Sequence, residues 1–190
     1  ANINGYPATI SRTGYTGELG FEIYADNVST ERIWKLLFSD SKDKITPAGL
    51  GSRDTLRMEM KYVLYGNDID QNINPIESGL GWITKMNKKD FIGKKILNQI
   101  KINPARSLVA IEMIDRGIPR KGYPIIKDSL GIGYITSGTQ SPSLQKGIGL
   151  AFIDTGYSKL GSELFIEVRN KHLKCKIVEA PFYKTGTVLD

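Results

Sequence analysis

A glycine-rich stretch near the start of the chain, residues 11–23, has residue types and spacing suited to ligand binding. Glycine recurs there at every third position: Gly14, Gly17 and Gly20. Because glycine permits a positive φ and a close approach of the backbone to a ligand, we expect a turn to present the ring of Tyr15. Glu22 alternates with apolar neighbours, and its carboxylate can accept two parallel N–H bonds from a flat heterocycle. The alternative is an ordinary glycine-rich hairpin with a solvated glutamate.

Two arginines four residues apart, Arg53 and Arg57, follow a Pro-Ala-Gly sequence of the kind that opens a helix. Small residues precede Arg53, so a ligand could approach its guanidinium, whose planar fork suits a carboxylate or a carbonyl-rich molecule. Arg57 is expected to be a solvated or ion-paired surface residue. Asp68 and Asp70 resemble part of a calcium loop, but the glycine and glutamate spacing is wrong, so we expect no metal site.

The amino-acid composition indicates a globular protein and argues against several other classes. The chain has 190 residues, of which 40% are hydrophobic and 24% charged, as is typical of a globular protein. The net charge of +6 is spread along the chain without an aromatic–basic RNA motif, and no apolar run approaches the roughly 18 residues of a membrane span. We therefore expect neither a nucleic-acid nor a membrane partner. The single cysteine, Cys175, fits a reducing compartment and a place in the core, whereas His172 is expected on the surface.

The chain changes character after residue 103. Helical periodicity predicts helices at residues 30–38, with Trp34 in the core, at 50–61, and in a third segment ending near Ile100. Beyond residue 103, turn signals separate five or six predicted strands, at residues 108–113, 123–126, 132–136, 147–153, 164–168 and 173–178. The predicted fold class is α+β, an antiparallel sheet with flanking helices followed by a small C-terminal all-β barrel. The predicted domains are residues 1–103 and 104–190.

Several short motifs occur together in a characteristic order. They lie at residues 14–18, 20–23, 48–50, 53–57, 64–69, 75–82, 90–93 and 136–144. In this combination the chain resembles the T-protein family of the glycine cleavage system, which are tetrahydrofolate-dependent aminomethyltransferases. The resemblance implies a reaction that moves the aminomethyl carbon from the lipoyl arm of H-protein to tetrahydrofolate, the co-substrate, and releases ammonia.

The resemblance also implies which residues bind the folate. Tyr15, Glu22 and Arg53 match the family's folate contacts, and Tyr183 is a fourth candidate near the C-terminus. The family's central acidic residue lies in a region N-terminal to Ala1, so we assign no catalytic residue in this chain. The chain is expected to be the C-terminal half of a T-protein and to have little or no activity alone.

Other members of this scaffold group remain as alternatives. One is a folate-dependent demethylase of a sulfonium or methylamine substrate, and another is a non-catalytic folate-binding module. The cysteine-bearing motif expected of the latter is absent, because Cys175 lies between two lysines. The expected location is the cytoplasm, or the mitochondrial matrix in a eukaryote.

Overall fold

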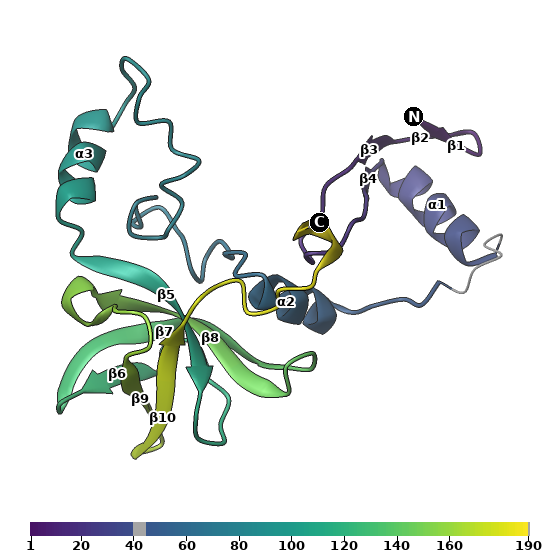
Figure 1. The fold of residues 1–190 in the computed structure, drawn as a ribbon. Helices are drawn as coiled ribbons and strands as arrows, with labels where there is room; N and C mark the ends of the chain where they lie inside the picture. Colours follow the sequence, from purple (N-terminus) through teal and green to yellow (C-terminus); the bar gives the residue numbers. More distant parts are fainter. Residues whose placement is uncertain (40–44, 190) are drawn as a thin grey trace. The chain divides into compact units, whose positions relative to one another are not determined.

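The computed structural model describes residues 1–39 and 45–189, which divide into two compact units (Figure 1). The first unit comprises residues 1–56 together with the C-terminal segment that begins at Lys184, and the second comprises residues 57–183. The mixture of helices and antiparallel sheet, with a closed barrel in the C-terminal part, confirms the predicted fold class. The division into domains at residue 103 stays a prediction.

Short strands and helices build the first unit. Its elements are β1 (Asn2–Ile3), β2 (Tyr6–Pro7), β3 (Thr9–Ser11), β4 (Glu22–Tyr24), α1 (Asn27–Ser39), the first part of α2 (Leu50–Glu59) and the 3-10 helix η2 (Thr187–Leu189). The strands form two antiparallel pairs, β1 with β2 and β3 with β4. Asn4 and Gly5 join the first pair with φ values of 48° and 87°, because an Asn-Gly turn matches the twist of a hairpin.

Helix α1 begins where its first residues find a capping side chain. The carboxylate of Asp26 accepts hydrogen bonds from the backbone N–H groups of Val28 and Ser29, both at 2.9 Å, and this satisfies donors that have no partner inside the helix. The prediction that Trp34 lies in the core is wrong. Its side chain is 54% exposed, with its ring 4.8 Å from that of Phe38.

The second unit contains the end of α2, helix α3 and the barrel (Figure 1). Its main elements are α3 (Lys94–Ile102), β5 (Arg106–Met113), β6 (Pro124–Lys127), β7 (Leu130–Ser141), β8 (Lys146–Asp154), the 3-10 helix η1 (Thr155–Tyr157), β9 (Glu163–Val168) and β10 (Lys171–Val178). The strands close in the spatial order β10-β5-β8-β7-β6-β9, and all neighbours are antiparallel. All six predicted strands are confirmed, and so are the three helices.

Alternation along the strands fills the barrel with apolar side chains. Its interior cluster consists of Ile111, Met113, Ile125, Ile132, Ile135, Ala151, Ile153, Leu164, Ile166, Cys175 and Ile177. As predicted, Cys175 is buried and its strand neighbour His172 is exposed. A Cβ on Gly133 would lie only 2.0 Å from the carbonyl oxygen of Phe152, so close contact between β7 and β8 requires glycine there.

Within the described residues, no helix combines the length and the apolar composition needed to cross a membrane. The same residues contain no group of three or more His, Cys, Asp or Glu side chains that could hold a metal ion.

Candidate functional site

Two of the predicted ligand-binding residues meet in the first unit. The guanidinium carbon of Arg53, on α2, lies 4.3 Å from the centre of the Tyr15 ring. This is a cation–π contact, and such contacts contribute about 0.5–1 kcal/mol at exposed sites. No other atom lies within 4 Å of a Cβ built on Gly49 or Gly51, the two glycines that precede Arg53. The ring of Tyr15 orients the guanidinium.

Tyr15 is presented by the loop between β3 and β4, as expected. Residues 12–21 form bends rather than a long strand, and only Glu22–Tyr24 pair with Thr9–Ser11. Among the three recurring glycines, only Gly17 has a positive φ, at 81°. The turn expected at Tyr15 is thus part of a loop of ten residues, and of the three recurring glycines one takes the left-handed conformation.

Glu22 lies at the first position of β4, opposite Ser11 of β3. The hydroxyl of Thr13 donates a hydrogen bond to the Glu22 carboxylate and lies 2.9 Å from the hydroxyl of Ser11. A small polar cluster therefore orients the carboxylate within its own hairpin. Its assignment as a ligand contact stays a prediction.

The fourth candidate, Tyr183, belongs to the second unit. Its backbone N–H donates a 3.0 Å hydrogen bond to the carbonyl oxygen of Glu59, at the end of α2. The side chain is half-buried, and its role in binding stays a prediction.

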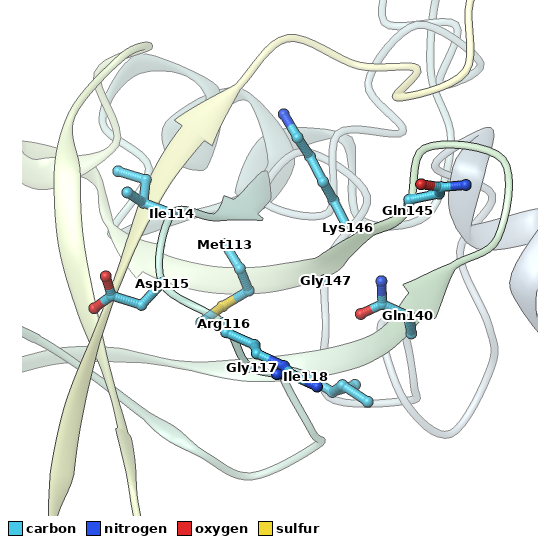
Figure 2. A pocket seen from close by; sticks show the side chains of 10 residues that line it. All are labelled: Met113, Ile114, Asp115, Arg116, Gly117, Ile118, Gln140, Gln145, Lys146 and Gly147. Carbon is cyan, nitrogen blue, oxygen red and sulfur yellow. The ribbon is translucent and has the colours of Figure 1, made fainter.

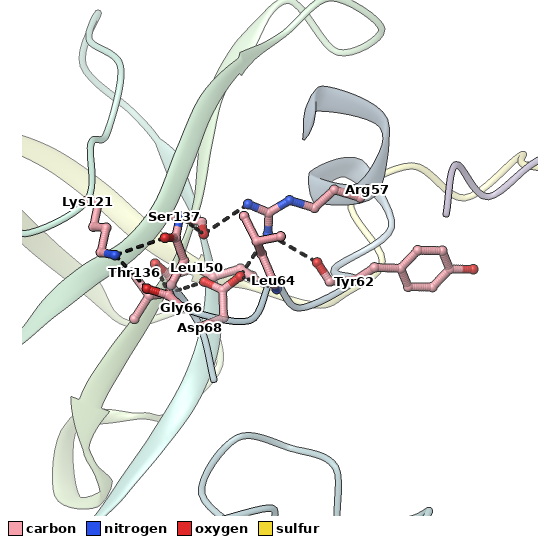
Figure 3. A network of polar contacts seen from close by, with 10 residues as sticks. Arg57, Tyr62, Leu64, Gly66, Asp68, Lys121, Thr136, Ser137 and Leu150 are labelled. Atoms are coloured by element: carbon pink, nitrogen blue, oxygen red, sulfur yellow. Dashed lines mark hydrogen bonds and ion pairs between the residues drawn. The ribbon is translucent and has the colours of Figure 1, made fainter. Parts of the chain in front are cut away.

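Arg57 overturns the expectation of a surface residue. Its side chain is 1% exposed, and it forms an ion pair at 2.8 Å with Asp68, whose side chain is fully buried (Figure 3). The guanidinium also donates to the backbone carbonyl of Tyr62 at 3.1 Å and to the hydroxyl of Ser137 on β7 at 3.0 Å. These contacts fix the end of α2 to the barrel.

The carboxylate of Asp68 also has several hydrogen-bond donors around it. Its carboxylate accepts hydrogen bonds from the backbone N–H of Leu64, at 2.9 Å, and from the hydroxyl of Thr136 (Figure 3). A carboxylate that is buried and neutralised by an arginine has a structural role rather than that of a metal ligand. Sequence reasoning noted both residues but could not pair them, because they are joined only through the path of the intervening loop.

Glu59 forms a second buried attachment of α2 to the barrel. Its side chain is 2% exposed and accepts hydrogen bonds from the hydroxyls of Ser141 and Ser143, at 2.5 and 2.9 Å. Ser141 is the last residue of β7, and Ser143 follows in the turn to β8. The segment that ends β7 and turns into β8 thus supplies hydrogen-bond donors to Glu59, at the end of α2.

The barrel also carries a cavity of about 850 Å³ at one end (Figure 2). Its lining mixes the apolar side chains of Met113, Ile114 and Ile118 with charged ones, Asp115, Arg116 and Lys146. Lys146 pairs with Glu112 at 2.9 Å. The cavity therefore presents apolar surface and charges of both signs.

Comparison with known proteins assigns a family. The family model for the GCVT N-terminal domain matches residues 1–88, and that for the glycine cleavage T-protein C-terminal barrel domain matches residues 106–184. The chain belongs to the glycine cleavage T-protein family.

Relatives of this T-protein chain carry the name aminomethyltransferase. The one from Oceanobacillus iheyensis is 54% identical over 182 residues, which are 94% of this chain and 49% of the relative. The one from Geobacillus sp. is 50% identical over 96% of this chain and 51% of its own length. The crystal structure of the glycine cleavage system aminomethyltransferase T from Bartonella henselae superposes with a TM-score of 0.86 at 31% identity, and covers 93% of this chain and 50% of that one. The chain thus spans about half the length of the curated relatives it matches.

Proposed function

We propose that the protein containing this chain is an aminomethyltransferase that moves the aminomethyl carbon from the lipoyl arm of H-protein to tetrahydrofolate and releases ammonia. The observation that carries the proposal is the contact between Arg53 and Tyr15 in a chain of the T-protein family. It joins two residues, distant in the sequence, whose chemistry suits a flat, polar heterocycle.

Each predicted residue has a distinct task toward tetrahydrofolate. The carboxylate of Glu22 accepts the adjacent N–H and NH2 donors of the pterin edge, which a carboxylate can bind in parallel. Tyr15 offers an aromatic face or its hydroxyl, and Arg53 offers a planar set of N–H donors. Tyr183 is the proposed fourth contact. These four residues bind and orient the folate, so they contribute to the reaction through positioning.

The 190-residue chain is expected to have little or no turnover by itself. The chain spans about half the length of the curated relatives it matches, and we assign the role of catalytic acid to no residue of it. The roles of this chain's residues are therefore tested by measuring tetrahydrofolate binding rather than turnover.

The Glu22 assignment is tested by replacing Glu22 with glutamine in the intact protein and measuring tetrahydrofolate binding by titration calorimetry. The loss of a charged hydrogen-bond acceptor should cost about 1–3 kcal/mol of binding free energy, or roughly a 5- to 150-fold rise in Kd. Glu31→Gln is the matched control, because Glu31 forms only an exposed i,i+4 pair with Lys35 on α1. Equal affinity of the Glu22 and Glu31 variants would defeat the assignment.

The surface charge supports an acidic carrier as the partner. The net charge of +6 attracts an acidic protein at long range, and Arg116 adds a cation to the lining of the barrel cavity. We expect the affinity for lipoylated H-protein to fall with rising salt and to fall further for Arg116→Glu than for Lys159→Glu, an exposed lysine outside the cavity lining. Salt-independent binding, with the two variants alike, would remove the electrostatic basis of the docking proposal.

A further inference from the structure

The C-terminal segment of the chain is hydrogen-bonded to the loop that carries Tyr15. The hydroxyl of Thr187 accepts a 2.8 Å hydrogen bond from the backbone N–H of Leu19 and donates one of 2.5 Å to the carboxylate of Glu18. The backbone N–H of Thr187 donates to the same carboxylate oxygen, at 3.1 Å. The backbone N–H of Val188 donates to the carbonyl oxygen of Gly17, also at 3.1 Å.

These four hydrogen bonds join residues about 170 positions apart, and they use both capacities of one hydroxyl. A threonine hydroxyl has one proton to donate and lone pairs to accept, and Thr187 does both at once. The bonds from Thr187 also lower the pKa of the Glu18 carboxyl below its ordinary value, so the carboxylate form accepts them. Gly17, with a positive φ of 81°, is buried at this point of the loop.

The loop needs such support for a physical reason. Strands β3 and β4 contribute only three residues each, and a two-stranded hairpin is at best marginally stable alone. Residues 12–21 between them contain three glycines, which lose more conformational entropy on ordering than other residues do. Contacts at the far end of the loop therefore decide how large a fraction of molecules holds Tyr15 against Arg53.

We propose that Thr187 is a positioning residue for the folate site: with Glu18 it forms a C-terminal latch that holds residues 12–21 in the conformation in which Tyr15 contacts Arg53. The inference rests on the proposed function for the identity of the ligand. A ligand that binds one loop conformation has its affinity reduced by the fraction of molecules in other conformations. Opening the latch thus weakens binding without removing any group that touches the folate.

The test compares Thr187→Val with Thr185→Val in the intact protein. Valine keeps the shape and the backbone N–H of residue 187 but removes the hydroxyl, and Thr185 is an exposed threonine of the same segment. Amide exchange of residues 13–21 should become about tenfold faster in Thr187→Val, and the Kd for tetrahydrofolate should rise by a similar factor. Thr185→Val should match the wild type, and Thr187→Ser should restore both properties because it restores the hydroxyl.

A variant of Glu18, the hydrogen-bond partner of Thr187, provides a second test. Glu18→Ala should loosen the same amides, and the double variant with Thr187→Val should be little worse than either alone, because each change removes the hydrogen bond between the two side chains. Unchanged loop exchange in Thr187→Val would overturn the latch, and faster exchange with unchanged folate affinity would overturn its role in positioning. A wild-type protein that does not bind tetrahydrofolate would refute the proposed function instead, and the exchange of residues 13–21 would still decide whether the latch exists.

Discussion

Replacing Asp68 with asparagine is expected to destabilise the unit formed by residues 57–183 by about 3–5 kcal/mol, the usual cost of breaking a buried ion pair from one side. Asparagine has nearly the same shape as aspartate, so the change removes charge rather than volume. The guanidinium of Arg57, 1% exposed, would then lose the 2.8 Å ion pair that it forms with Asp68. Two further acceptors of the guanidinium, the Tyr62 carbonyl and the Ser137 hydroxyl, are neutral.

The hydrogen bonds at Asp68 give a similar estimate of the stability lost in Asp68→Asn. The carboxylate accepts from Arg57 at 2.8 Å, from the Leu64 N–H at 2.9 Å and from the Thr136 hydroxyl. A hydrogen bond to a charged group contributes about 1.5–3 kcal/mol. An asparagine amide has one oxygen; when that oxygen faces Arg57 and Leu64, the NH2 group faces the Thr136 hydroxyl, which can donate instead to the Leu150 carbonyl at 3.1 Å. The main loss is therefore the negative charge of the acceptor that faces Arg57, in agreement with the cost of breaking a buried ion pair from one side.

Native-state amide exchange of β7 and β8 is the appropriate assay, because it reports the opening free energy of this unit even if the two units unfold separately. Asp70→Asn is the matched control. Asp70 lies in the same loop, where its side chain accepts a 2.7 Å bond from the N–H of Asn72 that an asparagine can also accept. We expect Arg57→Met to recover part of the loss in the Asp68→Asn background, because it removes the buried guanidinium whose ion pair with Asp68 has been lost. Equal effects of Asp68→Asn and Asp70→Asn would refute the reasoning.

Three further predictions concern other parts of the chain. Gly133→Ala should destabilise the barrel by at least about 1–3 kcal/mol in the same exchange assay, because its Cβ would overlap the Phe152 carbonyl, whereas Gly131→Ala meets open space and should have little effect. Burial raises the pKa of the Cys175 thiol to about 12, so a thiol reagent at pH 8 should label denatured but not native protein; rapid labelling of the native form would contradict this. Hydrogen bonds from Ser29 lower the pKa of the Asp26 carboxyl below its ordinary 3.8, so its stabilisation of α1 is complete above that value and is lost as the pH falls through the lowered pKa. Asp26→Asn keeps an acceptor and should abolish this acid dependence of amide exchange in α1; an unchanged pH profile would show that another group is responsible.

Much of the secondary structure follows from local pattern. The alternation of apolar residues identified every barrel strand, because one face of each strand must be buried when the sheet closes. The residues before α1 contained its capping signal, and Asp26 provides it. The same logic failed for Trp34, which is large and apolar but 54% exposed, since composition alone does not say which residues a short helix buries.

Some features of the candidate site were also readable from the local sequence, and others were not. The glycine spacing indicated a turn that presents Tyr15, and the helix signals placed Arg53 in a first turn. Their mutual contact at 4.3 Å depends on the path of the chain between them, which no local pattern encodes. Arg57 was misjudged for a related reason, because an arginine on a helix is usually solvated unless a distant residue offers a buried counter-charge.

The sequence by itself determined the class of fold, the order of its elements and the residue types at the candidate site, because periodicity and capping act over a few neighbouring positions. The tertiary structure alone decided the long-range partners: Asp68 for Arg57 across 11 residues, Ser137 for the same guanidinium across 80, and Thr187 for Leu19 across 168. A polar side chain can be buried only if such a partner reaches it, and the partner is set by how the whole chain folds back on itself.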